Sequence, residues 1–101
     1  MLRKIVREIE PDKIILFGSY AREEATPESD LDLFIIKDGI YDARQMRRQV
    51  DRLLTGRRFA VDIFVRTPAD VERNFRAQNP FYLYHIFKDG KVLYDKNART
   101  N

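Results

Sequence analysis

Leu16–Ile36 reads LFGSYAREEATPESDLDLFII, and the prediction of the whole fold starts from this stretch. An apolar strand runs into Gly18 and Ser19, and a second apolar strand opens with two carboxylates, Asp30 and Asp32. Side chains alternate along a strand, so both aspartates should point to the same side of the sheet. Such an arrangement can hold phosphate groups on the glycine–serine turn and a divalent cation on the carboxylates.

A third carboxylate, Asp62, lies within the apolar run 59–65. An aspartate buried in such a strand is costly unless it is paired or bound to a metal. If this strand lies beside the strand at 30–36, Asp62 can join the two earlier aspartates in one site. Carboxylate oxygens suit Mg²⁺, which proteins normally share with substrate phosphates. In that arrangement Asp62 would also accept the proton of an attacking hydroxyl group, as a general base.

The phosphate side of the predicted site rests on three residues. Gly18 permits a phosphate to approach the backbone closely, and Ser19 offers a hydroxyl group and exposed amides. Arg22, one turn further on, is another candidate for binding phosphate, although a surface role fits it equally well. Taken singly, a Gly-Ser, an Asp-x-Asp or a lone aspartate is more often a turn, a strand junction or an edge charge. Their joint occurrence on the expected elements favours a site.

Composition limits the class of protein. The chain has 101 residues, of which 44% are hydrophobic and 12% aromatic, so we expect one small folded domain rather than disorder. It has no cysteine, which excludes disulfides and thiolate chemistry. The charge of +3 is too mild to indicate direct nucleic-acid binding, and no apolar run is long enough for a membrane span. We therefore predict a soluble cytoplasmic protein.

Hydrophobic periodicity and turn residues predict the elements. The predicted helices cover 2–9, 20–25, 42–54, a segment from 68 and 81–87, and the predicted strands cover 13–17, 30–36, 60–65 and 91–94. Ser19 should cap the second helix, Gly56 should end the third, and Thr67 should cap the fourth. This order predicts an α/β (α+β) fold, in which a small mixed sheet is flanked by helices, over a domain at 1–95 with a polar tail at 96–101.

Three other features have a structural and a functional interpretation. The third predicted helix and the turn after it carry a set of arginines. This set is better explained as a solvated face than as a docking surface. Its members are Arg44, Arg47, Arg48, Arg52, Arg57 and Arg58. Most aromatic residues of 81–87 are predicted to lie in the core, with one or two exposed to a partner. His85 is predicted to be structural, because no second histidine or cysteine accompanies it.

The motif Gly18–Arg22, followed by Ser29–Leu33 and Val61–Ile63, resembles the DNA polymerase β-like nucleotidyltransferase superfamily. It is most similar to the minimal nucleotidyltransferases, or MNT proteins, and the similarity covers nearly the whole chain. One position departs from the pattern, because Glu23 stands where these proteins commonly have glycine. Its charge lies near the expected triphosphate and would weaken nucleotide binding.

The resemblance implies an activity and a partner. MNT proteins are usually encoded beside a HEPN-domain toxin, and they act as the antitoxin. Some transfer AMP from ATP to a tyrosine of the toxin. The resemblance implies that Asp30, Asp32 and Asp62 bind Mg²⁺, and that Gly18 and Ser19 hold the phosphates of ATP. Larger relatives add a domain that binds the acceptor, so here a partner protein is expected to supply it.

Two alternatives stay open at this point. The protein could be an antitoxin that neutralises its partner by binding alone, or a nucleotidyltransferase with a small-molecule or RNA acceptor. The nucleotide preference, the number of AMP groups transferred and the stoichiometry of a complex do not follow from the residues.

Overall fold

A computed structural model describes residues 2–39, 42–54, 56 and 60–98 of the chain. Eight elements follow one another in these segments. They are α1 (Leu2–Ile9), β1 (Lys13–Phe17), β2 (Leu31–Ile36), α2 (Ala43–Leu53), β3 (Val61–Arg66), α3 (Pro68–Arg76), η1 (Phe81–Lys88) and β4 (Lys91–Asp95).

The four strands form one mixed sheet in the order β3-β2-β1-β4. β1 is antiparallel to both β2 and β4, whereas β2 and β3 are parallel. The chain therefore returns across the sheet through α2 between its two parallel strands, as parallel pairs require. The predicted fold class, a small mixed sheet with flanking helices, is confirmed.

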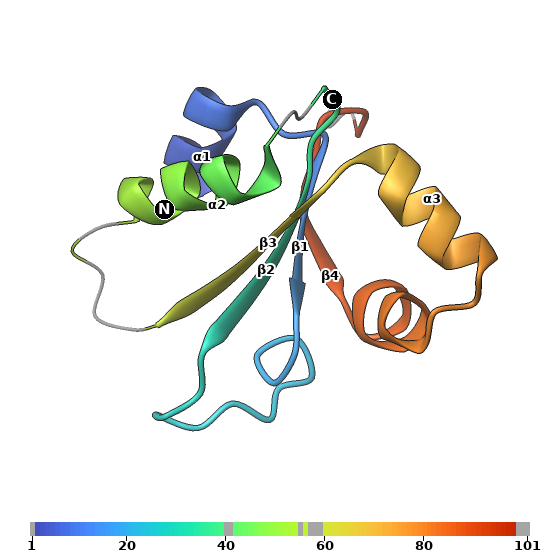
Figure 1. The fold of residues 1–101 in the computed structure, drawn as a ribbon. Helices are drawn as coiled ribbons and strands as arrows, with labels where there is room; N and C mark the ends of the chain where they lie inside the picture. The colour runs from blue at the N-terminus through green and yellow to red at the C-terminus, as the bar shows by residue number, and fades with distance from the viewer. Residues whose placement is uncertain (1, 40–41, 55, 57–59, 99–101) are drawn as a thin grey trace.

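Helices cover both faces of the sheet (Figure 1). On one face α1 and α2 pack on side chains such as Ile14, Leu33 and Val65, which are almost fully buried. The alternate residues of each strand point to the other face, where they pack against η1 and α3. Phe34 and Ile86 are almost fully buried in this second core. Strand residues of opposite parity thus enter two separate cores.

The segment after β1 differs from the prediction. Residues 20–25 do not form a helix, because the chain makes a single turn and leaves it, so the predicted role of Ser19 as the N-cap of a helix was wrong. The amide of Glu24 donates to the carbonyl of Ser19 (2.9 Å) and that of Glu23 to Tyr20 (3.3 Å), which is the hydrogen-bond pattern of a Schellman helix end. Glu23 itself has φ +60°, so a left-handed residue stops the helix after one turn.

The remaining boundaries agree with the prediction to within one or two residues. Asp42 caps α2 by accepting from the amides of Arg44 and Gln45, but the helix ends at Leu53 with Leu54 as its cap, so the predicted role of Gly56 was wrong. Arg57 and Arg58, the last two members of the predicted arginine set, lie outside the described residues. Tyr82 is buried while Tyr84 and Phe87 are exposed, which confirms the mixed prediction for that helix.

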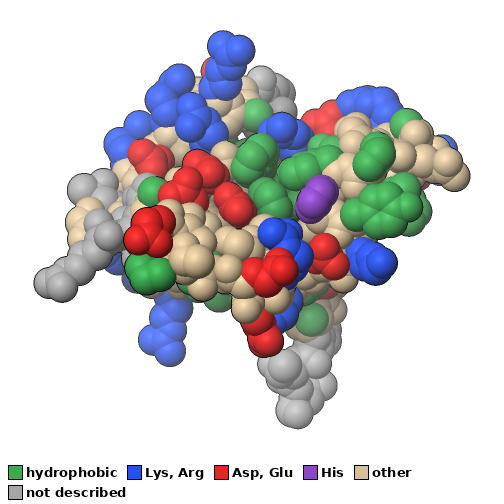
Figure 2. All heavy atoms as spheres, turned by 90° about the horizontal axis from the view of Figure 1, so that it is seen from below, with side chains coloured by type: hydrophobic (Ala, Val, Ile, Leu, Met, Phe, Trp, Pro, Cys, Tyr) green, Lys and Arg blue, Asp and Glu red, His purple; other side chains and the backbone are tan. Residues whose placement is uncertain are grey.

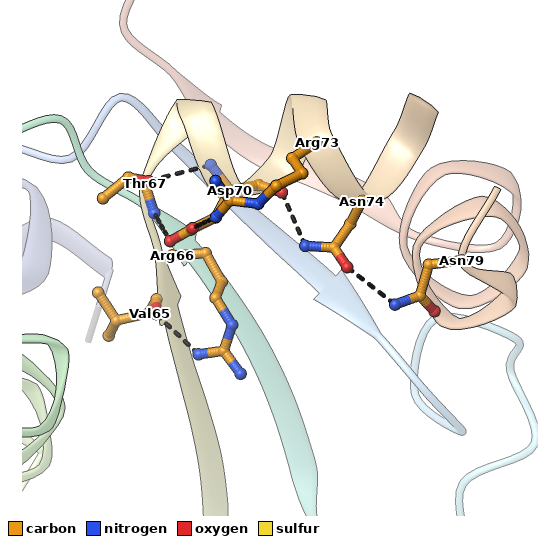
Figure 3. A network of polar contacts seen from close by, with 7 residues as sticks. All are labelled: Val65, Arg66, Thr67, Asp70, Arg73, Asn74 and Asn79. Atoms are coloured by element: carbon orange, nitrogen blue, oxygen red, sulfur yellow. Dashed lines mark hydrogen bonds and ion pairs between the residues drawn. The ribbon is translucent and has the colours of Figure 1, made fainter. Parts of the chain in front are cut away.

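Figure 3 shows how α3 begins and how it is joined to η1. The hydroxyl of Thr67 accepts from the amide of Asp70 at 3.1 Å, and the carboxylate of Asp70 accepts from the amide of Thr67, which forms a capping box. At the other end the side chain of Asn79 donates to Asn74 at 2.9 Å. η1 is a π-helix, which is rare at this length and is often found near functional sites.

Within the described parts of the chain, no helix is long and apolar enough to cross a membrane.

Candidate active site

Two of the predicted carboxylates lie side by side on adjacent strands. Asp32 of β2 and Asp62 of β3 are partners in the parallel register, so their side chains project from the same face of the sheet. This is the face covered further along by η1 and α3. The prediction that these two strands lie side by side is confirmed. The side chain of Asp62 is exposed, however, so the expectation of a buried aspartate was wrong.

Gly18 closes this site from the end of β1. Its φ is +78°, a left-handed conformation that favours glycine. A Cβ atom added there would lie 2.1 Å from Oδ2 of Asp32, nearer than any real Cβ contact. The carboxylate of Asp32 therefore occupies the space that a side chain at this position would need, so such a side chain would have to displace Asp32.

Asp30 lies one residue before β2 and is exposed. It is close enough for its charge to act on Asp32. Among the described residues, however, no group of three or more carboxylates or imidazoles is arranged to hold a metal ion. The structure therefore brings Asp32 and Asp62 together and leaves Asp30 beside them.

The protonation of Asp32 depends on the other carboxylates that lie close to it. Burial raises the pKa of Asp32 above its usual range, and the negative charges of Asp62 and Asp30 raise it further. A hydrogen bond with the Asp62 carboxyl group acts in the same direction, and the positive charge of Arg22 opposes it. Two carboxylates that repel each other in this way are a fitting place for a cation to bind.

The turn after Gly18 presents the other predicted residues. Ser19 is partly buried, and the carbonyl of Gly18 accepts from the amide of Arg22 at 3.2 Å. The Nε atom of Arg22 donates to Glu24 at 2.7 Å, an exposed ion pair that leaves both Nη groups of the guanidinium to other partners. Arg22 is thus a cation beside the carboxylates, as its effect on Asp32 shows.

Aromatic side chains form the floor of the site, which the prediction missed. Phe17 is the antiparallel partner of Asp32, and its ring contacts Phe64 and Phe81 edge-on at 5.4 and 5.5 Å between centroids. The alternation of side chains along β1 carries a signal for this position, because Phe17 and Ile15 are two residues apart and therefore point to the same face of the sheet. Because residues 14–17 form a continuous apolar run, the sequence predicts a buried strand but does not show which side chains face the site.

Figure 2 looks onto the end of the sheet from which the Gly18 loop projects. Acidic side chains gather on this surface, with hydrophobic side chains and the single histidine next to them. His85 is exposed, and the centroid of its ring lies 5.9 Å from that of Phe81 in a tilted arrangement. Among the described interactions it has no carboxylate or second histidine as a partner.

The residues of this site fit a divalent cation. The donors are carboxylate oxygens from two adjacent strands, whose mutual repulsion a cation would relieve, and the glycine leaves the space for Asp32. Asp32 and Asp62 would hold the ion, and Asp30 is a further carboxylate whose charge acts on Asp32.

Fold and site together define a nucleotidyltransferase. The family model described as polymerase β, nucleotidyltransferase, matches residues 2–99. The chain belongs to this family, and its small domain is of the minimal, MNT type.

Two similar proteins were found by comparison. A protein of Methanocaldococcus jannaschii named "Putative protein adenylyltransferase" is 34% identical over 83 residues, which cover 81% of this chain and 77% of that protein. A solved structure described as a toxin-antitoxin with AMP-PNP is similar with a TM-score of 0.54 and 18% identity, over 95% of this chain and 72% of that one. At this identity the second similarity concerns the fold alone.

Proposed function

We propose that this nucleotidyltransferase transfers AMP from ATP to a hydroxyl group of a partner protein, with Mg²⁺ as its metal. The observation that carries the proposal is the in-register pair of Asp32 and Asp62 next to Gly18. The name of the archaeal relative supports a protein acceptor, and the AMP-PNP of the structural neighbour supports an adenine nucleotide.

Each site residue has a role in this reaction. Asp30, Asp32 and Asp62 would hold Mg²⁺, which supplies positive charge next to the α-phosphate and the leaving pyrophosphate. Asp62 accepts the proton of the acceptor hydroxyl, whose oxygen forms a bond to the α-phosphorus. The bond from that phosphorus to the bridging oxygen breaks, and pyrophosphate leaves with the electron pair.

The turn at 18–22 would hold the β- and γ-phosphates. Gly18 allows them to approach the backbone, and Ser19 offers its hydroxyl group and amide. The Nη groups of Arg22, which Glu24 does not occupy, provide the positive charge. Glu23 is exposed, and its carboxylate forms an ion pair with Lys91 at 3.6 Å, so its charge lies at the rim of this turn.

We propose a HEPN-domain toxin as the partner, with a tyrosine hydroxyl as the acceptor and this chain as the antitoxin. The structural neighbour's toxin-antitoxin description supports a toxin partner. The chain also exposes large apolar side chains on α3 and η1, which is typical of a docking surface. Phe75 is 50%, Tyr84 54% and Phe87 41% exposed, and the rings of Phe75 and Phe87 contact each other.

The same exposed patch favours the alternative in which the protein neutralises its partner by binding alone. In that case the carboxylate pair would contribute nothing to protection. The two functions therefore make different predictions for a variant that keeps the fold and the patch but loses a metal ligand.

The experiment is to incubate the chain with the HEPN protein encoded beside it, ATP and Mg²⁺, and to measure the intact mass of the HEPN protein. An added AMP, lost with Asp32→Asn and kept with the exposed surface control Asp38→Asn, supports protein adenylylation. A stable complex without added mass, and full protection by Asp32→Asn, would establish the binding-only antitoxin. Label from the α-phosphate of ATP in small molecules or RNA would establish another acceptor.

A further inference from the structure

Among the strands that the structure describes, β3 forms one edge of the sheet, because the strand order places β2 alone beside it (Figure 1). An edge strand presents backbone donors and acceptors to its surroundings, and proteins usually cover or protect such an edge. Here α2 lies against β3 and borders this edge on one face.

The hydrogen bonds to β2 tell which groups point outward. The amide of Leu31 donates to the carbonyl of Ala60, and that of Lys37 donates to Arg66. Even-numbered residues of β3 therefore pair with β2, and the N–H and C=O groups of Ile63 and Val65 point to the free edge. In the part of the chain that is described, the amides of both residues have no strand partner on that side.

One outward group is hydrogen-bonded to a side chain of the same strand. Nη1 of Arg66 donates to the carbonyl of Val65 at 2.8 Å, as Figure 3 shows. The guanidinium lies 5.9 Å from the ring centroid of Phe64, so the side chain folds along the edge. A flexible side chain that covers a single carbonyl is easily displaced by a strand that pairs with the whole edge.

A groove of about 260 Å³ follows this edge between α2 and β3. Its lining includes Arg44 and Arg47 of α2 and Arg66 of β3, and it includes no carboxylate among the described residues. Arg44 and Arg47 are exposed, and neither has a described ion pair. Three cations thus lie along a row of edge backbone groups that have no strand partner in the described part of the chain.

We propose that this groove binds an extended, acidic segment of a partner protein as a fifth strand beside β3. Backbone hydrogen bonds to Ile63 and Val65 would supply the pairing, and carboxylates of the segment would meet Arg44 and Arg47. A nucleic acid matches the positive charge but not the alternating donors and acceptors of the edge, so a peptide strand fits better. The site lies on the α2 side of the sheet and is separate from the carboxylate pair.

The probe is a fluorescein-labelled, N-acetylated octapeptide of alternating glutamate and valine, measured by fluorescence anisotropy with the full chain. We expect binding that Arg47→Glu weakens about fivefold or more, because it reverses a charge in the groove. Arg48→Glu is the matched control, since it changes the same charge on the next residue, which does not line the groove. It should leave binding unchanged.

Backbone pairing is tested separately. We use two versions of the peptide, one N-methylated at the glutamates and one at the valines. Each version lacks one set of amide donors, and at least one of them should lose binding. Hydrogen exchange measured by NMR should slow at Ile63 and Val65 when the unmodified peptide binds.

Three results would overturn the proposal: no binding at millimolar peptide, binding of both methylated peptides as tight as that of the unmodified peptide, or equal effects of Arg47→Glu and Arg48→Glu. Displacement by single-stranded oligothymidylate without protection at Ile63 and Val65 would show a general polyanion surface instead. The binding test does not involve ATP or the carboxylates, so its failure leaves the proposed transferase function untouched.

Discussion

Replacing Glu23 with glycine should stabilise the protein. Glu23 occupies the left-handed position of a Schellman helix end, with φ +60°, where glycine is the usual residue. A residue with a Cβ costs about 1–2 kcal/mol in this conformation. Glycine offsets part of that gain, because it loses about 0.5–1 kcal/mol more conformational entropy on folding.

The other terms at this position are small. The ion pair of Glu23 with Lys91 is 3.6 Å long, and the Glu23 side chain is 84% exposed, so its loss should change the free energy of unfolding very little. The net expectation for Glu23→Gly is a gain of about 0.5–1 kcal/mol. For a domain of this size that corresponds to a rise in Tm of about 2–8 °C.

The assay is thermal and urea denaturation followed by circular dichroism, with Glu23→Ala as the matched control. Alanine removes the same carboxylate and ion pair but keeps a Cβ at the left-handed position, so its Tm should not rise. If both variants gain equally, the charge and not the backbone is responsible, and the reasoning from φ is refuted. Nucleotide binding separates the two effects, because loss of charge at the rim should tighten it in both variants.

Three further changes test other parts of the structure. Gly18→Ala should abolish nucleotidyl transfer and lower the Tm by several degrees, because its Cβ would lie 2.1 Å from Oδ2 of Asp32 and its φ is left-handed; a fully active variant with unchanged Tm would contradict this packing. In the presence of a chelator, Asp32→Asn should raise the Tm at pH 7 and have no such effect below about pH 4. The folded-state pKa of Asp32 is raised, so its ionisation lowers stability as pH rises through the interval between the unfolded and folded pKa values. Thermal unfolding across pH 3–8 measures this, and equal Tm differences at all pH values would count against it. Thr67→Ala should cost about 1 kcal/mol by removing the capping box of α3, whereas Thr67→Ser should retain most of it, as urea denaturation can check.

Local patterns were sufficient for much of the fold. The spacing of Leu2, Ile5 and Ile9 predicted α1, and the Thr67–Pro68 pair predicted the start of α3, because caps and periodicity depend on a few neighbouring residues. The same local reasoning failed after β1. Ser19 and the residues following it are compatible with a helix, but the chain must turn back to enter β2, and a left-handed Glu23 ends the helix at once.

The sequence alone predicted a carboxylate site, because Asp30 and Asp32 share a parity and Asp62 is the one charge in its own apolar run at 59–65. Only the tertiary structure decided which carboxylates meet. The parallel register of β2 and β3 joins Asp32 to Asp62 and places Gly18 against them, while Asp30 stays outside the strand. Strand pairing joins segments about 30 residues apart through the burial of two cores, and no short window of sequence contains that long-range contact.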